Sequence, residues 1–222
     1  MSEVIITVRG EHETRVAPEE AVVRSSVRAD GPERGDVIER AAALAEPLRD
    51  ELAALMDAGA VREWSSGRAA AWADRPWNEQ GTQLPLVHHA SVEVMAVFPD
   101  FDELSRWLTE AAGIDGVHID GIQWRLTPAT EKAVEAASAA AAVRVAVDRA
   151  TAYADAIGRS SVTPLEIADL GLLAQTQPAA GRPEIMRMAK ASFAADAGGP
   201  AFEFRPEELV VSAAVEGRFS AR

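Results

Sequence analysis

Stretches in which apolar and polar residues nearly alternate lie close to both ends of the chain. One of them reads Ile5-Ile6-Thr7-Val8-Arg9-Gly10-Glu11, and the other covers residues 208–215. Because successive side chains of a strand point to opposite faces, this alternation predicts a β-strand near each end. Three helical segments lie between them. The same part of the chain contains no recognisable catalytic motif. The pattern therefore constrains the architecture much more than it constrains the function.

Further strands are predicted by the same alternation in the middle of the chain. The clearest covers residues 86–98, where one face, from Leu86 to Phe98, is almost wholly apolar and should face the core. The other predicted strands cover residues 20–29, 61–71, 117–126, 165–173 and 208–219.

The first helix is predicted to begin at Asp36, because Glu39 stands three residues later as in a capping box. Its apolar residues recur at intervals of three and four as far as Leu55, and Gly59 ends it. Pro47 lies inside this run, so we expect the helix to kink or to split in two.

The second and third helices carry stronger start signals. Asp100 and Glu103 repeat the capping-box spacing, and Thr127 followed by Pro128 is typical of a helix start. The third helix should run to about residue 157, and its alanine-rich stretch at 136–142 should allow very close packing. Ala146, Ala150, Tyr153 and Ile157 lie opposite a polar stripe on this helix.

Two strand–helix–strand segments, residues 20–71 and 86–126, follow one another. Each helix begins with the same D-x-x-E spacing, and each following strand contains a tryptophan, Trp64 or Trp124. We interpret this as a possible structural duplication.

Residues 174–205 differ from the rest, because they are rich in Ala, Gly and Pro without a sustained period. We expect a long, partly disordered loop within a single domain that covers residues 1–222. Met186, Met188 and Phe193 could form a helical turn that docks at an adaptable interface, or they could be incidental apolar residues of a mobile loop.

The formal net charge of −13 argues against nucleic acid or an anionic membrane surface as a direct partner. The chain has no cysteine, which excludes disulfides, thiolate nucleophiles and cysteine-bound metals. No stretch approaches the ~20 apolar residues of a membrane span, and the first residues do not read as a signal peptide. We therefore expect a cytoplasmic protein without membrane insertion.

The order and spacing of several segments resemble the SIMPL domain family, whose proteins are largely of unknown function. The resemblance covers nearly the whole chain. It rests on residues 6–11, Pro18 with Ala21, and on residues 90–97, 101–104, 121–126, 152–158 and 206–215. It implies an α+β fold, with three main helices packed on a mostly antiparallel mixed sheet of about six or seven strands. It also implies homo-oligomers, because family members build ring-like assemblies, and it transfers no catalytic residue.

Two features of this chain depart from the family pattern. Many bacterial members are exported and begin with a signal peptide, which argues against an envelope role for a chain without one. Pro47 is unexpected in the first helix.

No motif or cluster of residues predicts catalysis. His88 and His89 are strand neighbours, so their side chains point to opposite faces and cannot bind one ion together. A site would need Glu93 or Asp120 to approach one of them or His118. We therefore expect neither a catalytic residue, nor a cofactor, nor a metal.

Trp72 and Trp77 flank a short polar loop between two strands. Exposed tryptophans concentrate at interfaces, which favours a partner-binding loop, whereas a hairpin that folds back would bury both rings. With Met186, Met188 and Phe193 they are the candidate partner-binding residues.

Two functions remain open from the sequence. The first is a non-enzymatic, self-assembling scaffold or binding protein that forms homo-oligomers or binds a protein partner. The alternative is a small-molecule-binding protein or enzyme that uses a carboxylate–histidine site around His88, Glu93, His118 and Asp120.

Overall fold

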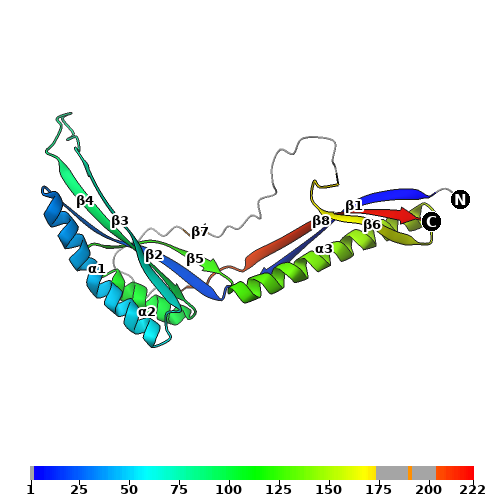
Figure 1. The fold of residues 1–222 in the computed structure, drawn as a ribbon, viewed down its shortest axis with the longest axis horizontal. Helices are drawn as coiled ribbons and strands as arrows, with labels where there is room; N and C mark the ends of the chain where they lie inside the picture. The colour runs from blue at the N-terminus through cyan, green and yellow to red at the C-terminus, as the bar shows by residue number, and fades with distance from the viewer. Residues whose placement is uncertain (1–2, 174–189, 192–203) are drawn as a thin grey trace. The chain divides into compact units, whose positions relative to one another are not determined.

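The computed structural model describes residues 3–173, 190–191 and 204–222 of the chain. It contains three helices, seven strands of at least eight residues and one two-residue strand, and every strand pair is antiparallel. The predicted α+β class is thus confirmed, although the strands form two sheets instead of one (Figure 1). The elements are β1 (Val4–Val16), β2 (Glu20–Gly31), α1 (Arg34–Asp57), β3 (Glu63–Asp74), β4 (Val87–Phe98), α2 (Phe101–Ala111), β5 (Val117–Arg125), α3 (Pro128–Ala156), β6 (Val162–Asp169), β7 (Lys190–Ala191) and β8 (Leu209–Ala221).

The chain divides into two compact units. Unit 1 comprises Met1–Ala17, Leu126–Met188 and Glu208–Arg222, and unit 2 comprises Pro18–Arg125 and Ala189–Glu207. The sequence predicts that residues 1–222 fold as a single domain. That the two units fold together in this way stays a prediction.

Unit 1 is a three-stranded sheet, in the order β1-β8-β6, with α3 packed on it. The two strands predicted near the ends of the chain are partners, in register from Val4 opposite Ala221 to Val16 opposite Leu209. The core joins apolar residues of the sheet, among them Ile6, Val8 and Phe219, to a row of alanines on α3.

The buried row on α3 consists of every fourth residue: Ser138, Ala142, Ala146, Ala150 and Ala154. Four residues exceed one 3.6-residue turn, so the row winds slowly around the helix, as a strongly twisted narrow sheet requires. The buried row contains only two of the four residues that lie opposite the polar stripe. Ala146 and Ala150 are buried, but Tyr153 and Ile157 are 55% and 53% exposed.

Small residues bring α3 very close to β1. A Cβ atom added to Gly10 would overlap the carbonyl oxygen of Ala142 and lie 2.7 Å from the backbone nitrogen of Ala146. Further along the same contact, the Thr14 and Ser138 hydroxyl oxygens are 2.8 Å apart and form a hydrogen bond. The close approach predicted for the alanine-rich helix is present at Ala142.

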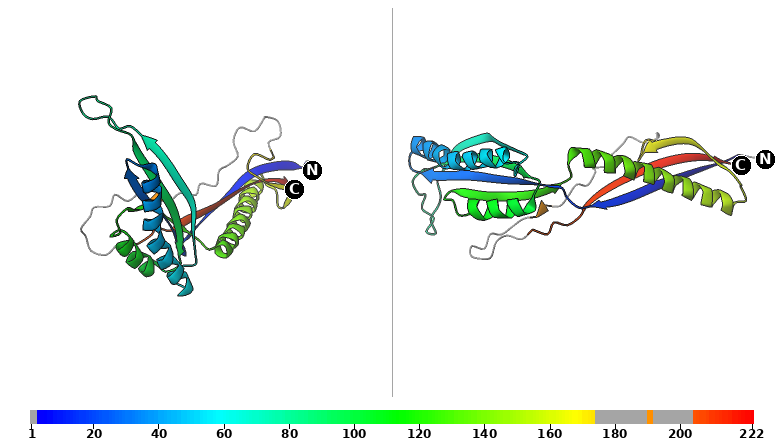
Figure 2. Two further views of the ribbon diagram at one scale, coloured as in Figure 1. Left: turned by 60° about the vertical axis from the view of Figure 1, so that its left-hand side comes forward. Right: turned by 90° about the horizontal axis from the view of Figure 1, so that it is seen from below.

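Unit 2 is a sheet in the order β3-β4-β2-β5, extended by the short β7. The strand–helix–strand segments β2-α1-β3 and β4-α2-β5 are interleaved, because β4 lies between β2 and β3, and β2 lies between β4 and β5. This is the ferredoxin-like arrangement of two split β-α-β units. It agrees with the predicted duplication, and both helices lie on the same face of the sheet (Figure 2).

The first helix differs from its prediction at two points. It begins at Arg34 after Glu33, which makes no side-chain capping bond, so Asp36 lies in the first turn instead of at the cap. It also runs unbroken through Pro47. Pro47 and Ala43 are both exposed, so the Ala43 carbonyl that loses its helical partner can bind water.

The predicted starts of the other two helices are confirmed. The Asp100 carboxylate accepts hydrogen bonds from the backbone nitrogens of Asp102 and Glu103, at 2.8 and 3.2 Å. The Thr127 hydroxyl accepts one from the backbone nitrogen of Thr130 at 3.3 Å. The loop predicted at 174–205 lies mostly outside the described residues; within it, Lys190 and Ala191 pair with β5.

Candidate binding surface on the open sheet face

The sheet of unit 2 has one face covered by α1 and α2 and one face that we call the open face. On β2, Ala21, Val23 and Val27 point toward the helices and are buried, whereas Arg24 and Arg28 point the other way and are exposed. On β4, Glu93 is exposed on the same side as these arginines. The open face therefore presents charged side chains on a rigid antiparallel sheet.

Two β-bulges lie at the same level of this sheet, one on each side of its central strand pair. The register shifts between Ser65 and Arg68 on β3, and between Arg24 and Ser25 on β2 where it pairs with β5. The second shift leaves Asp120 as the extra residue, since Ile119 lies opposite Ser25 and Gly121 lies opposite Arg24. Bulges change the direction of side chains, and they are common beside binding sites.

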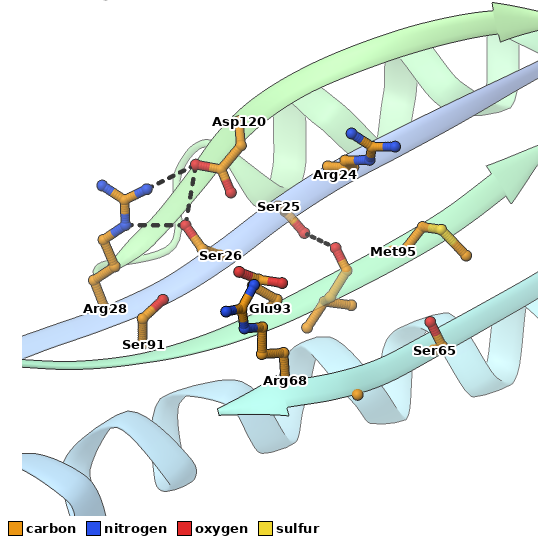
Figure 3. A pocket seen from close by; sticks show the side chains of 12 residues that line it. Arg24, Ser25, Ser26, Arg28, Ser65, Arg68, Ser91, Glu93, Met95 and Asp120 are labelled. Carbon is orange, nitrogen blue, oxygen red and sulfur yellow. Dashed lines mark hydrogen bonds and ion pairs between the residues drawn. The ribbon is translucent and has the colours of Figure 1, made fainter. Parts of the chain in front are cut away.

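A shallow hollow of about 580 Å³ lies between the two bulges. Figure 3 shows that side chains of β2, β3, β4 and β5 surround it. Its lining combines three arginines and two carboxylates with serines, a methionine and a glycine: Arg24, Ser25, Ser26, Arg28, Ser65, Gly67, Arg68, Ser91, Glu93, Val94, Met95 and Asp120.

One corner of the hollow is a closed network of hydrogen bonds. The Arg28 Nη2 atom donates to Asp120 Oδ1 at 2.8 Å, and Arg28 Nε donates to Ser26 Oγ at 3.0 Å. Ser26 Oγ donates in turn to Asp120 Oδ1 at 3.1 Å (Figure 3). The bulge on β5 thus turns Asp120 toward β2, where its charge is balanced by Arg28.

The other two arginines of the hollow are not balanced in this way. Among the described residues, neither Arg24 nor Arg68 has an ion pair or side-chain hydrogen bond. Arg68 lies opposite Glu93 in the ladder of β3 and β4, and Figure 3 shows the two side chains next to each other. With three arginines and two carboxylates, the hollow is locally cationic in a chain whose net charge is −13.

The open face continues beyond the hollow to an aromatic cluster. Trp72 lies opposite His89 in the ladder, and their rings stack with centroids 5.3 Å apart and an interplanar angle of 19°. His89 Nε2 is 3.5 Å from Asp74 Oδ1. Trp72 is nevertheless 48% exposed, because one side of its ring has no cover.

Trp77 belongs to the loop that joins β3 to β4, where it forms an isolated bridge with Gln83. It is 67% exposed, more than any other large apolar residue in the part of the chain that the structure describes. The reading in which the hairpin folds back and buries both tryptophans is therefore wrong, because Trp72 on β3 and Trp77 in the loop are both exposed. Met186, Met188 and Phe193, the other candidate partner-binding residues, lie outside the described residues.

The residues suggested for a carboxylate–histidine site do not all meet. Glu93 and Asp120 line the hollow, and His118 lies opposite Ser26 in the ladder, but His88 points to the face of the helices. Within the part of the chain that the structure describes, no three His, Asp or Glu side chains are placed to hold a metal ion.

A second polar cluster in unit 2 consists of ion pairs within the fold. The Glu20 carboxylate is fully buried and is paired with Arg62 and with Arg125, whose Nε atom is 2.8 Å from Glu20 Oε2. Arg125 Nη2 also lies 3.4 Å from Glu63 Oε1. This cluster connects β2, β3 and β5, and its charges are used within the fold.

The fold and its open face define an α+β protein with a ferredoxin-like unit and a helix-covered three-stranded unit. The family described as SIMPL, protein of unknown function (DUF541), matches residues 6–219, so the chain belongs to the SIMPL family. No curated protein matches it significantly. Among the described residues, no helix is both long and apolar enough to cross a membrane.

The arginines of the hollow were not predicted as site residues from the sequence. The signal that could have found them is their position on the alternating pattern of β2, where Arg24 and Arg28 share the outer face. The β-bulges could not be predicted from the alternating pattern of one strand, because each bulge depends on the pairing with a partner strand.

Proposed function

We propose that this chain is a non-enzymatic protein that assembles with copies of itself through the side of unit 2 formed by the β3–β4 hairpin. The observation that carries the proposal is the exposure of Trp72 and Trp77 on one hairpin, at 48% and 67%. Large aromatic side chains contribute most of the binding energy in many interfaces, and leaving two of them in water is unfavourable.

The test is the mass of the protein in solution, measured by light scattering after size exclusion over a range of concentrations. We expect a discrete oligomer for the wild type and a smaller species for the double variant Trp72→Ala/Trp77→Ala. Tyr153→Ala is the matched control, because Tyr153 is an exposed aromatic residue of unit 1, and it should leave the mass unchanged. A wild-type monomer at every concentration would contradict the proposal.

A second function is favoured by the two unpaired arginines of the hollow. Arg24 and Arg68 could bind the carboxylate or phosphate group of a small anion, since a guanidinium group forms two parallel hydrogen bonds with such groups. A ligand that binds the folded state raises the melting temperature. Titration with citrate and inorganic phosphate should therefore stabilise the wild type but not Arg24→Gln/Arg68→Gln. Equal shifts in both proteins would exclude the hollow as the site.

A further inference from the structure

Strand β3 is the outermost strand of the unit 2 sheet. One of its edges pairs with β4, and no described segment pairs with the other. The backbone N–H and C=O groups along a free edge can pair with another strand, and proteins usually prevent this with lysine, proline or inward-pointing charges. The free edge of β3 is therefore a place where a further strand can add to the sheet.

The second half of β3 lacks such protection. Between Arg68 and Asp74 it reads Ala69-Ala70-Ala71-Trp72-Ala73, without a charge or a proline. Alanine is depleted in strands in general, so four of them in seven positions need another explanation. Their small side chains leave the edge open to the close approach of a second backbone.

The two charges that bound this segment are placed symmetrically. Arg68 and Asp74 are each three residues from Ala71, and both belong to the set of alternate residues that faces the open side of the sheet. If two copies of β3 pair antiparallel about a two-fold axis at Ala71, Arg68 of each copy lies opposite Asp74 of the other. The same pairing brings Trp72 opposite Ala70 of the second copy, so both indole rings gain cover.

In the neighbouring registers, Arg68 no longer lies opposite Asp74 of the second copy. Moving the axis to Ala70 places Arg68 opposite Trp72, and moving it to Trp72 places Arg68 opposite Pro76. Neither arrangement forms an ion pair across the edge, and the second brings a residue without an N–H donor into the ladder.

We propose that two copies of this chain associate through the free edges of β3, antiparallel and centred on Ala71, to form one continuous sheet. The inference rests on the proposed self-assembly and names its contact. The symmetric interface is isologous, as in most two-fold dimers. A contact of about seven residues per copy is small for a stable interface, so we expect dissociation constants in roughly the micromolar range from this edge alone.

The first test exchanges the two charges. Arg68→Asp should place like charges opposite each other twice and weaken dimerisation at least tenfold, and Asp74→Arg should do the same. The double variant Arg68→Asp/Asp74→Arg should restore dimers, because each ion pair returns with reversed polarity. Both residues are exposed, and circular dichroism would check that each variant is folded.

The second test uses the absence of cysteine from the natural sequence. The two-fold axis places Ala71 opposite itself, with Cα atoms about 4.5–5.5 Å apart, within the range that a disulfide can bridge. Ala71→Cys should thus form a covalent dimer under mild oxidation in the full chain. Ala152→Cys, at an exposed position of α3 in unit 1, is the matched control and should stay mostly monomeric.

The outcomes separate this inference from the proposed self-assembly. A wild type that is monomeric throughout contradicts both. An oligomer that is unaffected by the charge variants and does not cross-link at Ala71→Cys contradicts only the β3 contact. Loss of dimers in both single variants and their recovery in the double variant would support the register.

Discussion

At the scale of single residues, Gly10 sets the distance between β1 and α3. Its α-carbon faces the backbone of α3, and no side chain can be added there without moving the helix. The alanines at positions 142 and 146 complete this contact, since a larger residue at either position would also separate the two elements. The packing of α3 on β1 in unit 1 therefore requires a residue without a side chain at position 10.

We predict that Gly10→Ala destabilises the protein by about 3 kcal/mol, at the upper end of the range for added core volume, because the clash is with backbone atoms. The midpoint of urea denaturation measures this effect. Gly35→Ala is the control, because a Cβ at Gly35 meets no atom within 4 Å and the residue lies in the first turn of α1. It should be neutral or slightly stabilising. Equal midpoints for the two variants would mean that α3 can shift freely on the sheet.

Residue-level features were predictable only where their cause is local. The capping residues Asp100 and Thr127 were identified correctly, because their hydrogen bonds reach no further than three positions along the chain. Asp120 was considered only as a partner for histidine. Its actual partners, Ser26 and Arg28, are more than ninety positions away and are brought to it by a bulge.

At the scale of elements, the face that a helix buries depends on the sheet beneath it. A straight helix on a flat surface would bury residues at intervals of three and four, which on α3 would add Tyr153 and Ile157 to the buried alanines. On the narrow sheet of unit 1, α3 instead buries every fourth residue. Such a sheet can be expected only after β1, β6 and β8 are known to form a sheet of their own, and the alternation of each strand alone does not reveal this.

Helices α1 and α2 carry acidic residues that affect each other. Partial burial raises the pKa of Glu51 on α1, and the Glu110 carboxylate on α2 raises it further. A carboxyl group whose pKa is higher in the folded state stabilises the protein when protonated. This contribution is complete below the unfolded-state pKa of about 4.3 and is lost as the pH rises through the folded-state pKa.

Glu51→Gln should therefore stabilise the protein at neutral pH, by on the order of a few tenths of a kcal/mol because Glu51 is only partly buried and solvent screens its charge. The gain should vanish near pH ~4, where Glu51 of the wild type is protonated. Urea denaturation at both pH values measures the difference. Glu46→Gln, at an exposed site on the same helix, controls for the loss of a surface carboxylate. A gain that is the same at both pH values would contradict the role of ionisation.

At the scale of the whole molecule, unit 2 is nearly one continuous segment, whereas unit 1 is assembled from three. Residues 18–125 contain four strands and two helices, and they lie in the chain between β1 and α3. The family resemblance indicated the fold class and the numbers of helices and strands. It did not indicate the division into two sheets, because the strands of both alternate in the same way.

The continuity of unit 2 predicts that a fragment of residues 18–125 folds alone. It retains the core between the sheet and both helices, including the packing of Trp124 against Phe101. It loses the contact between Trp124 and Phe204, which should cost about 1 kcal/mol. Circular dichroism and a cooperative thermal transition would confirm folding. A fragment without such a transition would support the single domain expected from the sequence.

The pairing of β1 with β8 has a consequence for synthesis on the ribosome. Strand β1 is made long before its partner β8, which begins at Leu209, so β1 must wait until all the segments between the two strands have been translated. The main segment of unit 2, residues 18–125, is completed much earlier and can fold while the rest is still being made. During that interval the nascent protein therefore carries an unpaired β1 strand ahead of folded residues 18–125, and that strand is open to chaperones or to the wrong partner.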